Sequence, residues 1–444
     1  MAEPTSVSRR DFVKSSLVTA GAITIPAAFA GGVHAAGEEP IRLGLIGCGG
    51  RGTGAVSNAI ESSPNVKIVA MADLAQSHLD GSREALRSAW EEKGNYAVTD
   101  EACFVGEDAY KHLCAHPDVD IVIQTTPPGL RFLTLREAIE QGKHSFVEKP
   151  VCVDSFGYRH VLESGKLADE RGLAIVTGTQ YRRENSYREA IERLHDGIIG
   201  ELVGAYAYYC TGSLWLKGSE ADWETWGGFG NTAYQMRNWL YFAWLSGDHI
   251  AEQAIHNLDA INWGFGGPPE VAYGSGGRLQ RNDPKYGDIY DHFSIDFDYP
   301  GDKRVTFKCR QQAGAMGRVT NRFIGTKGRM DIRPAPGSSA TIARDLSGKV
   351  IWNHNGRKNN NAPYVEEHRA LIESIRGGDP IQEIQGVADS SLTCIIGREA
   401  AYSGQEVRFD WAADESKLKL SPDEIKLADY PVRPVPIPGT YKLV

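Results

Sequence analysis

The feature that most constrains this chain is a glycine-rich turn between two apolar runs. The turn, Gly47–Gly52 (GCGGRG), directly follows the run Ile41–Ile46. A second run, Val66–Ala72, lies further along the chain and ends in Asp73. Strand, G-x-G-x-x-G turn, helix, strand and acid form the pattern of a dinucleotide-binding βαβ unit, whereas an isolated glycine pattern also occurs in ordinary loops. The sequence therefore predicts a parallel sheet that binds a dinucleotide at this turn.

The glycines have separate physical roles. The first permits a tight turn, the second lets the backbone approach a pyrophosphate, and the third lets the helix pack closely on the sheet. Backbone N–H groups at the start of the following helix would hold the phosphate charge. The predicted cofactor residues at the turn are Gly47, Gly49, Gly50, Arg51 and Gly52.

Asp73 indicates which dinucleotide is bound. A carboxylate here would accept a hydrogen bond from the adenosine ribose 2′-OH and would repel a 2′-phosphate. We therefore expect NAD and regard NADP as the less favoured cofactor.

The N-terminus reads as an export signal. A charged stretch with paired Arg9 and Arg10 precedes the apolar segment Leu17–Pro26 and a series of small residues. This layout predicts a twin-arginine signal peptide over residues 1–35, the export machinery as a partner, and a periplasmic or otherwise exported protein. An uncleaved anchor is the alternative, although the apolar segment is short for a membrane span. Because this route carries folded proteins, we expect the cofactor to travel bound and to be regenerated in place.

Strands and helices keep alternating after Asp73. The apolar runs 119–124, 144–147 and 173–177 are separated by helical stretches, which predicts a doubly wound parallel Rossmann sheet over residues 38–180. Ligands bind beyond the carboxyl ends of such strands. The predicted residues at that edge, besides the turn, are Thr125, Pro127, Glu148 and Lys149.

The pattern changes in the second half. Long aromatic and β-branched segments at 204–212 and 291–312, with a hairpin at Pro300-Gly301, predict an α+β domain over residues 181–404. The fold class is therefore α/β, with a Rossmann domain followed by an open, largely antiparallel sheet whose outer face we expect to form a homo-oligomer, a dimer or tetramer. The proline-rich residues 405–444 read as an extended C-terminal arm.

Together the turn, Asp73, Thr125–Pro128, Gly142–His144 and Glu148–Pro150 resemble the Gfo/Idh/MocA oxidoreductases, over roughly residues 40–400. The resemblance implies a Rossmann domain followed by an α/β domain and oxidation or reduction of a sugar, sugar-acid or cyclitol hydroxyl. It also implies that Lys149 lies near the nicotinamide and polarises the reacting oxygen. The alternative is that Lys149 is an ordinary surface lysine.

The rest of the family's site would lie in the segment 247–259. His256 matches the family's general acid/base, and Glu252 stands four residues earlier, where Asp is usual. On a continuous helix these two would share a face, so the carboxylate could orient the imidazole. A satisfied core histidine is the alternative. His249, Glu252 and His256 could also bind a divalent ion, but the H-E-x-x-H pattern is absent and we assign no metal.

Composition and aromatic content point to a small-molecule substrate. The net charge of −9 gives no reason to expect nucleic acid. Aromatic faces interleaved with carboxylates suit carbohydrates, although we expect about half of the aromatic residues to be core or interface residues. These residues are Trp215, Trp223, Trp226, Phe229, Tyr234, Trp239, Tyr241 and Trp244.

Three hypotheses follow. The first is an exported NAD-dependent oxidoreductase acting on a sugar or glycoside hydroxyl with a tightly bound cofactor. The second is a redox-neutral NAD-dependent glycosidase resembling glycoside hydrolase family 109, which would oxidise, eliminate, hydrate and reduce. The third is a binding or sensory protein that keeps NAD as a structural ligand, against which Lys149 and His256 argue.

Overall fold

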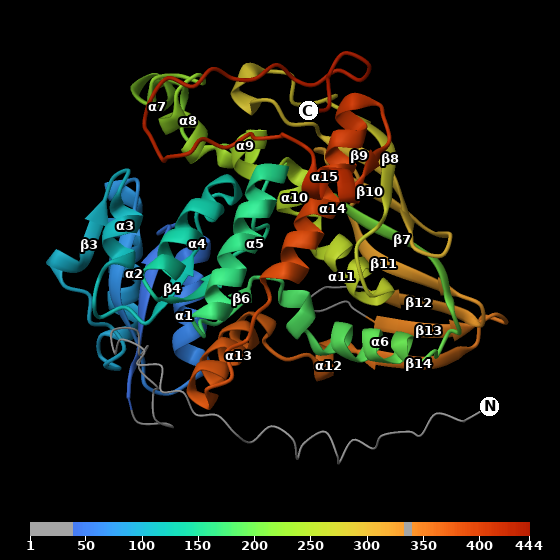
Figure 1. The fold of residues 1–444 in the computed structure, drawn as a ribbon, viewed down its shortest axis with the longest axis horizontal. Coiled ribbons are helices and arrows are strands. Elements are labelled where there is room, and N and C mark those ends of the chain that lie inside the picture. Colours follow the sequence, from blue (N-terminus) through green and yellow to red (C-terminus); the bar gives the residue numbers. More distant parts are fainter. Residues whose placement is uncertain (1–38, 333–339) are drawn as a thin grey trace, which may run out of the picture. The chain divides into compact units, whose positions relative to one another are not determined.

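Two sheets organise residues 39–332 and 340–444, the part of the chain that the computed structural model describes (Figure 1). The predicted signal peptide over residues 1–35 lies outside the described residues. In the described part, none of the helices combines the length and the apolar character needed to cross a bilayer.

The first sheet has six parallel strands in the order β3-β2-β1-β4-β5-β6. Its order reverses at β1 and β4, which is where a doubly wound sheet binds its ligand. The predicted Rossmann sheet is confirmed. Its strands are β1 (Ile41–Ile46), β2 (Val66–Asp73), β3 (Cys103–Val105), β4 (Ile121–Gln124), β5 (His144–Val147) and β6 (Ile175–Thr177).

Helices cover both faces of this sheet because its strands are apolar on both sides, and two separate buried clusters form against them. The connecting helices are α1 (Gly50–Ser62), α2 (Gln76–Trp90), α3 (Ala109–Cys114), α4 (Arg131–Glu140) and α5 (Ser155–Glu170).

The second sheet has nine strands in the order β14-β13-β12-β11-β7-β10-β9-β8-β15. Among the described strands of this second sheet, only β7 and β10 pair in parallel, so the predicted largely antiparallel sheet is confirmed. The hairpin predicted at Pro300-Gly301 joins β9 to β10. The strands are β7 (Leu202–Thr211), β8 (Val271–Gly277), β9 (His292–Tyr299), β10 (Lys303–Gln311), β11 (Arg318–Gly325), β12 (Gly328–Ile332), β13 (Ala340–Asp345), β14 (Val350–Asn355) and β15 (Val407–Arg408).

A long excursion between β7 and β8 carries short helices and the predicted His256. The remaining helices are α6 (Asn185–His195), α7 (Glu220–Thr225), α8 (Thr232–Arg237), α9 (Ala243–Ser246), α10 (His249–Glu252), α11 (Ile255–Phe265), α12 (Gly356–Asn359), α13 (Pro363–Gly377), α14 (Ile384–Ser403) and α15 (Phe409–Asp414). After α15 the C-terminal arm runs without regular structure over the excursion (Figure 1).

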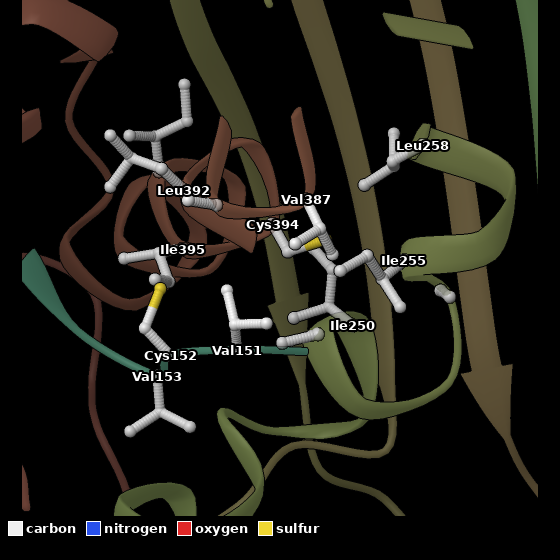
Figure 2. Packing of buried hydrophobic residues seen from close by; sticks show 14 of the residues in the cluster. Val151, Cys152, Val153, Ile250, Ile255, Leu258, Val387, Leu392, Cys394 and Ile395 are labelled. Atoms are coloured by element: carbon white, nitrogen blue, oxygen red, sulfur yellow. The ribbon is translucent and has the colours of Figure 1, made fainter. Parts of the chain in front are cut away.

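Helix α14 is buried along nearly its whole length and joins the two halves of the molecule. Figure 2 shows its side chains packed against the segment Val151–Val153, which follows Lys149, and against Ile250 and Ile255, which flank Glu252. The cluster therefore fixes the two segments that carry the predicted catalytic residues.

Helix α13 returns to the first sheet and covers one of its faces. Its His368 is buried, with its ring 4.1 Å from that of Phe146 on β5, and its Nε2 has no hydrogen-bond partner. Burial, and to a smaller extent the charge of Arg51, lowers the pKa of His368 to about 3. The imidazole is therefore neutral throughout the range in which a free histidine titrates.

The neutral state of His368 predicts an acid-dependent loss of stability. In the unfolded chain His368 titrates near 6.5, so below that pH the unfolded state binds one more proton than the folded state. The free energy of unfolding should fall by about 1.4 kcal/mol per pH unit from this residue as pH drops from about 6.5 towards 3.

Urea unfolding at pH 5, 6 and 7 measures this slope. His368→Asn should lower this slope by about 1.4 kcal/mol per pH unit, the contribution of one proton. His112→Gln, a change at an exposed histidine, should leave the slope unaltered. Equal slopes for wild type and His368→Asn would contradict the assignment.

Candidate active site and cofactor cleft

An open cleft with about 820 Å³ of empty space lies at the carboxyl edge of the first sheet. Five of the predicted cofactor residues line it: Gly47, Gly49, Asp73, Thr125 and Pro127. Its opposite wall comes from elements that sequence reasoning did not connect with the cofactor: Met236, Arg237, Trp239 and Ile425.

The glycine turn has the geometry its spacing predicts. Gly47 has φ +91°, a left-handed conformation that favours glycine. A Cβ on Gly52 would lie 2.1 Å from the carbonyl oxygen of Gly47, whereas nothing lies within 4 Å of a Cβ built on Gly49 or Gly50. Thr125 Oγ1 donates to the Gly47 carbonyl at 2.6 Å and fixes the turn to β4. The open space above Gly49 and Gly50 is the cradle that a pyrophosphate needs.

The acid end of the cleft also fits a dinucleotide. Asp73 accepts hydrogen bonds from the backbone N–H groups of Cys48 at 2.6 Å and Ala75 at 2.8 Å, which fixes its carboxylate at the cleft wall. The hydroxyl of Thr126, which also lines the cleft, is buried without a partner. An orphaned hydroxyl and an anchored carboxylate in one cleft are groups that a dinucleotide could bind through hydrogen bonds.

Arg51 departs from its predicted place. It does not line the cleft; its Nε donates to Glu148, and its Nη2 lies 3.7 Å from the buried Glu367. Its guanidinium lies 4.7 Å from the ring centroid of Tyr364. Burial would raise the pKa of Glu148, but the charges of Arg51, Lys149 and Arg131 outweigh burial and lower it, so Glu148 is ionised.

Lys149 is held against Glu252. Its Nζ donates to the Glu252 backbone carbonyl at 2.6 Å and lies 3.6 Å from Glu252 Oε1. Both side chains are 14% exposed, so the ammonium is not a solvated surface group. The buried Arg131 donates to the carbonyl of Pro150 and fixes the backbone next to the lysine. The alternative of an ordinary surface lysine does not describe this geometry.

His256 lies near Lys149 but does not bond to Glu252. The helix expected to carry both is broken into α10, which ends at Glu252, and α11, which begins at Ile255. His256 is buried, its Nδ1 has no partner, and Glu252 Oε2 also lacks one. The predicted orientation of the imidazole by the carboxylate is therefore absent, because residues 252 and 256 do not share a continuous helix face.

The charge state of His256 follows from its surroundings. Burial lowers the pKa of His256 well below its usual range, and the charges of Lys149 and Arg51 lower it further. Its ring lies 5.1 Å from that of Tyr181, which stacks on Tyr187 at 4.4 Å. A neutral imidazole with a free nitrogen can accept a proton.

The three residues weighed as metal ligands are not gathered together. His249 Nδ1 is paired with Asp248 at 2.9 Å, and its Nε2 contacts the thiol of Cys309 at 3.4 Å. Both ring nitrogens of His249 are therefore in contact with residues other than Glu252 and His256. Among the residues with described positions, no group of three histidines, cysteines and carboxylates has metal-binding geometry.

Most of the residues around these side chains, and several of the aromatic candidates, have structural contacts. Asp259 is paired with Arg182 at 2.8 Å, and Arg183 with Glu383, so both arginines are engaged within the chain. Of the aromatic residues, Tyr234, Tyr241 and Trp244 are buried core residues and Trp215 is exposed. Trp239 is the one among the eight that reaches the cofactor cleft.

Two family profiles match this chain. Residues 41–179 match the oxidoreductase family with NAD-binding Rossmann fold of Gfo/Idh/MocA proteins, and residues 187–331 match a GFO/IDH/MocA C-terminal domain. The protein is a Gfo/Idh/MocA family oxidoreductase-like protein. Its first sheet is an NAD-binding Rossmann sheet, as the cleft geometry indicates.

Relatives of this Gfo/Idh/MocA protein match about half of the chain. Glycosyl hydrolase family 109 protein 2 of Shewanella sp. (strain ANA-3) is 28% identical over 246 residues, which are 52% of this chain and 51% of that protein. The chain thus spans about half the length of that relative.

Solved structures share the fold at low identity. Aldose-aldose oxidoreductase from Caulobacter crescentus, complexed with glycerol, superposes with a TM-score of 0.65 at 18% identity, over 83% of this chain and 99% of that one. GenD2 from gentamicin A biosynthesis, in complex with NAD, superposes with a TM-score of 0.62 at 15% identity, over 88% of this chain and 99% of that one.

The glycine turn yields a stability prediction. Gly52→Ala places a methyl group against the Gly47 carbonyl, so α1 must move away from the turn. We expect a loss of about 1–3 kcal/mol in the free energy of unfolding and weaker NAD binding.

Urea unfolding and NAD titration measure both effects. Gly54→Ala, on the same helix with only Arg51 Nη1 at 4.0 Å from the added Cβ, should be neutral or stabilise by up to about 1 kcal/mol. If the two variants behave alike, close packing at Gly52 does not determine the turn.

Proposed function

We propose that this protein is an exported NAD-dependent oxidoreductase that transfers hydride between a sugar or glycoside hydroxyl and a tightly bound nicotinamide cofactor. One observation carries the proposal: a largely buried lysine and a neutral imidazole whose Nδ1 has no partner lie near each other beside the carboxyl edge of an NAD-binding sheet. This pairing is what removal of an alcohol proton requires. Bound NAD would supply the hydride acceptor, at the edge lined by Thr125–Pro127.

The protein's own residues divide the proton chemistry. Lys149, fixed by the Glu252 carbonyl, would donate a hydrogen bond to the substrate oxygen and stabilise the charge that develops on it. His256, neutral and with Nδ1 free, would accept the hydroxyl proton. Glu252 would balance the lysine charge at 3.6 Å rather than orient the imidazole.

A redox-neutral glycosidase is the second candidate. Two observations favour it: the neutral imidazole is a base that could also abstract a carbon-bound proton next to an oxidised centre, and a relative is named for glycoside hydrolase family 109. Such a reaction regenerates the cofactor in each turnover, which suits an exported protein.

Export and assembly belong to the same proposal. We propose the twin-arginine route from the paired Arg9 and Arg10 and the apolar segment that follows. We propose a homo-oligomer through the outer face of the second sheet, where Val203 and Tyr206 of β7 are 49% and 44% exposed.

A glycoside panel without added NAD, incubated in deuterated water, separates the two reactions. An oxidoreductase should give a ketosugar, or one oxidised and one reduced sugar, with no aglycone released. A glycosidase should release the aglycone with no net redox change, and its sugar should carry solvent deuterium at the carbon that lost its proton. If neither set of products is found, both candidates are contradicted.

Replacement of Lys149 tests the catalytic assignment. Lys149→Met removes the donor to the substrate oxygen while leaving the cofactor cleft intact, so turnover should fall by about 10²–10⁴-fold with NAD still bound. The matched control, Lys166→Met, changes an exposed lysine on α5 and should not alter turnover. Turnover that survives Lys149→Met would overturn the assignment.

His256 predicts the pH profile. A base must be unprotonated, and since burial holds the pKa of His256 well below its usual range, activity should persist below pH 6.5 rather than decline there. His256→Asn should lower kcat about 10²–10⁴-fold at every pH. An acid limb of kcat/KM near 6.5 that disappears in His256→Asn would show that the imidazole titrates normally.

A further inference from the structure

The cofactor cleft has a wall that does not belong to the nucleotide-binding sheet. Met236 and Arg237 of α8 and Trp239 of η5 (Trp239–Tyr241) line it together with the glycine turn and with Ile425 of the C-terminal arm. These residues are far from the turn in sequence and lie outside the NAD-binding domain matched at residues 41–179.

The negative charge in the cleft with a dinucleotide bound would have to be balanced by a cation, and the first sheet does not provide one. Asp73 and Glu107 line the cleft, and a dinucleotide adds the two negative charges of its pyrophosphate. The start of α1 offers backbone N–H groups worth roughly half a positive charge. Arg51, the arginine of the turn, is engaged by Glu148. Among the described residues that line the cleft, Arg237 is the only lysine or arginine.

Arg237 is available for this role. Within the described part of the chain no ion pair engages it, and the one hydrogen bond of its side chain is the long one from Nη1 to the carbonyl of Ala233, at 3.4 Å. Its guanidinium lies 4.6 Å from the ring centroid of Trp226, which supports the planar group from one side. An arginine fork of this kind can bind two phosphate oxygens at once.

The C-terminal arm holds α8 in place. The Thr232 hydroxyl donates to the Lys426 carbonyl at 2.8 Å, and the Gln235 side chain donates to the carbonyl of Tyr430 at 2.7 Å. The same arm reaches the first sheet, because the N–H of Leu427 donates to the Glu107 carboxylate at 2.5 Å. The arm thus ties α8 to the loop that borders the cleft.

The arm also contributes apolar contact at this point. Ile425 packs against a buried cluster of the first sheet that includes Ala72 and Tyr110. We propose that α8 and residues 417–430 form a clamp over the dinucleotide, in which Arg237 is the cationic ligand of the pyrophosphate and the arm restrains release. The clamp rests on NAD binding alone, independently of which sugar reaction follows.

Binding of ADP and of adenosine to the full-length chain tests the ligand role. ADP carries a pyrophosphate and adenosine does not, so loss of a phosphate contact affects only the first. Arg237→Gln should raise the Kd of ADP about tenfold or more and that of adenosine less than twofold, measured by calorimetric titration. Arg237→Lys, which keeps the charge, should recover most of the loss.

Lys217→Gln is the matched control, since it removes one positive charge from the same excursion but not from the cleft. It should leave both affinities within twofold. If Arg237→Gln weakens ADP and adenosine by the same factor, its role is structural, and if it weakens neither, Arg237 does not bind the pyrophosphate. Either result overturns the assignment. No sugar is present, so such a failure leaves the proposed sugar chemistry untouched.

Leu427→Pro tests the arm, because proline has no N–H to donate to Glu107. The rate of NAD dissociation, followed by fluorescence after rapid dilution, should rise about tenfold. Lys442→Ala changes an exposed side chain of the arm outside residues 417–430 and should leave the rate unchanged. An unaltered rate in Leu427→Pro would show that the arm does not restrain the cofactor.

Discussion

The active site depends on the packing of α14 between two segments that are far apart in sequence. This helix contacts the stretch after Lys149 on one side and α10 and α11 on the other (Figure 2). The buried Arg398 reinforces the contact by donating to the carbonyl oxygens of Val153 at 2.9 Å and Gly247 at 3.1 Å. Because protein interiors are close-packed, a shift of either segment would open a void in this cluster. The short bond from Lys149 to Glu252 is a consequence of that packing.

Neighbouring charges explain the protonation states of the buried carboxylates and of the imidazole at this site. Glu148 sits among Arg51, Arg131 and Lys149, and a buried carboxylate in such a setting stays ionised since the attraction exceeds the cost of desolvation. Glu367 has the same side chain but no hydrogen-bond partner, so burial and the neighbouring charge of Glu148 raise its pKa. His256 is neutral for a related reason, because adding a proton would place a third buried cation near Lys149 and Arg51.

Local patterns in the sequence were sufficient for the sheets and for much of the cleft. The turn at Gly47–Gly52, Asp73 and the hairpin at Pro300-Gly301 are short-range signals, and they lie where spacing places them. The break between α10 and α11 has no such signal, since neither glycine nor proline interrupts the segment and the break arises from tertiary packing. Arg237 reaches the cleft through the path of the excursion between β7 and β8, and Ile425 through the path of the arm, neither of which periodicity can predict.

The two candidate reactions make the same demand on the cofactor. In both, a tightly bound cofactor must be reoxidised in the same site, by the same sugar or by a second acceptor, so the dinucleotide has to outlast the turnover. A Rossmann cleft by itself is open at its carboxyl edge, and the glycine turn supplies dipoles but little net charge. Contacts from α8 and the arm are made by parts of the chain outside the nucleotide-binding sheet. Retention can therefore be adjusted without altering Lys149 or His256, which separates the lifetime of the bound cofactor from the chemistry of the sugar.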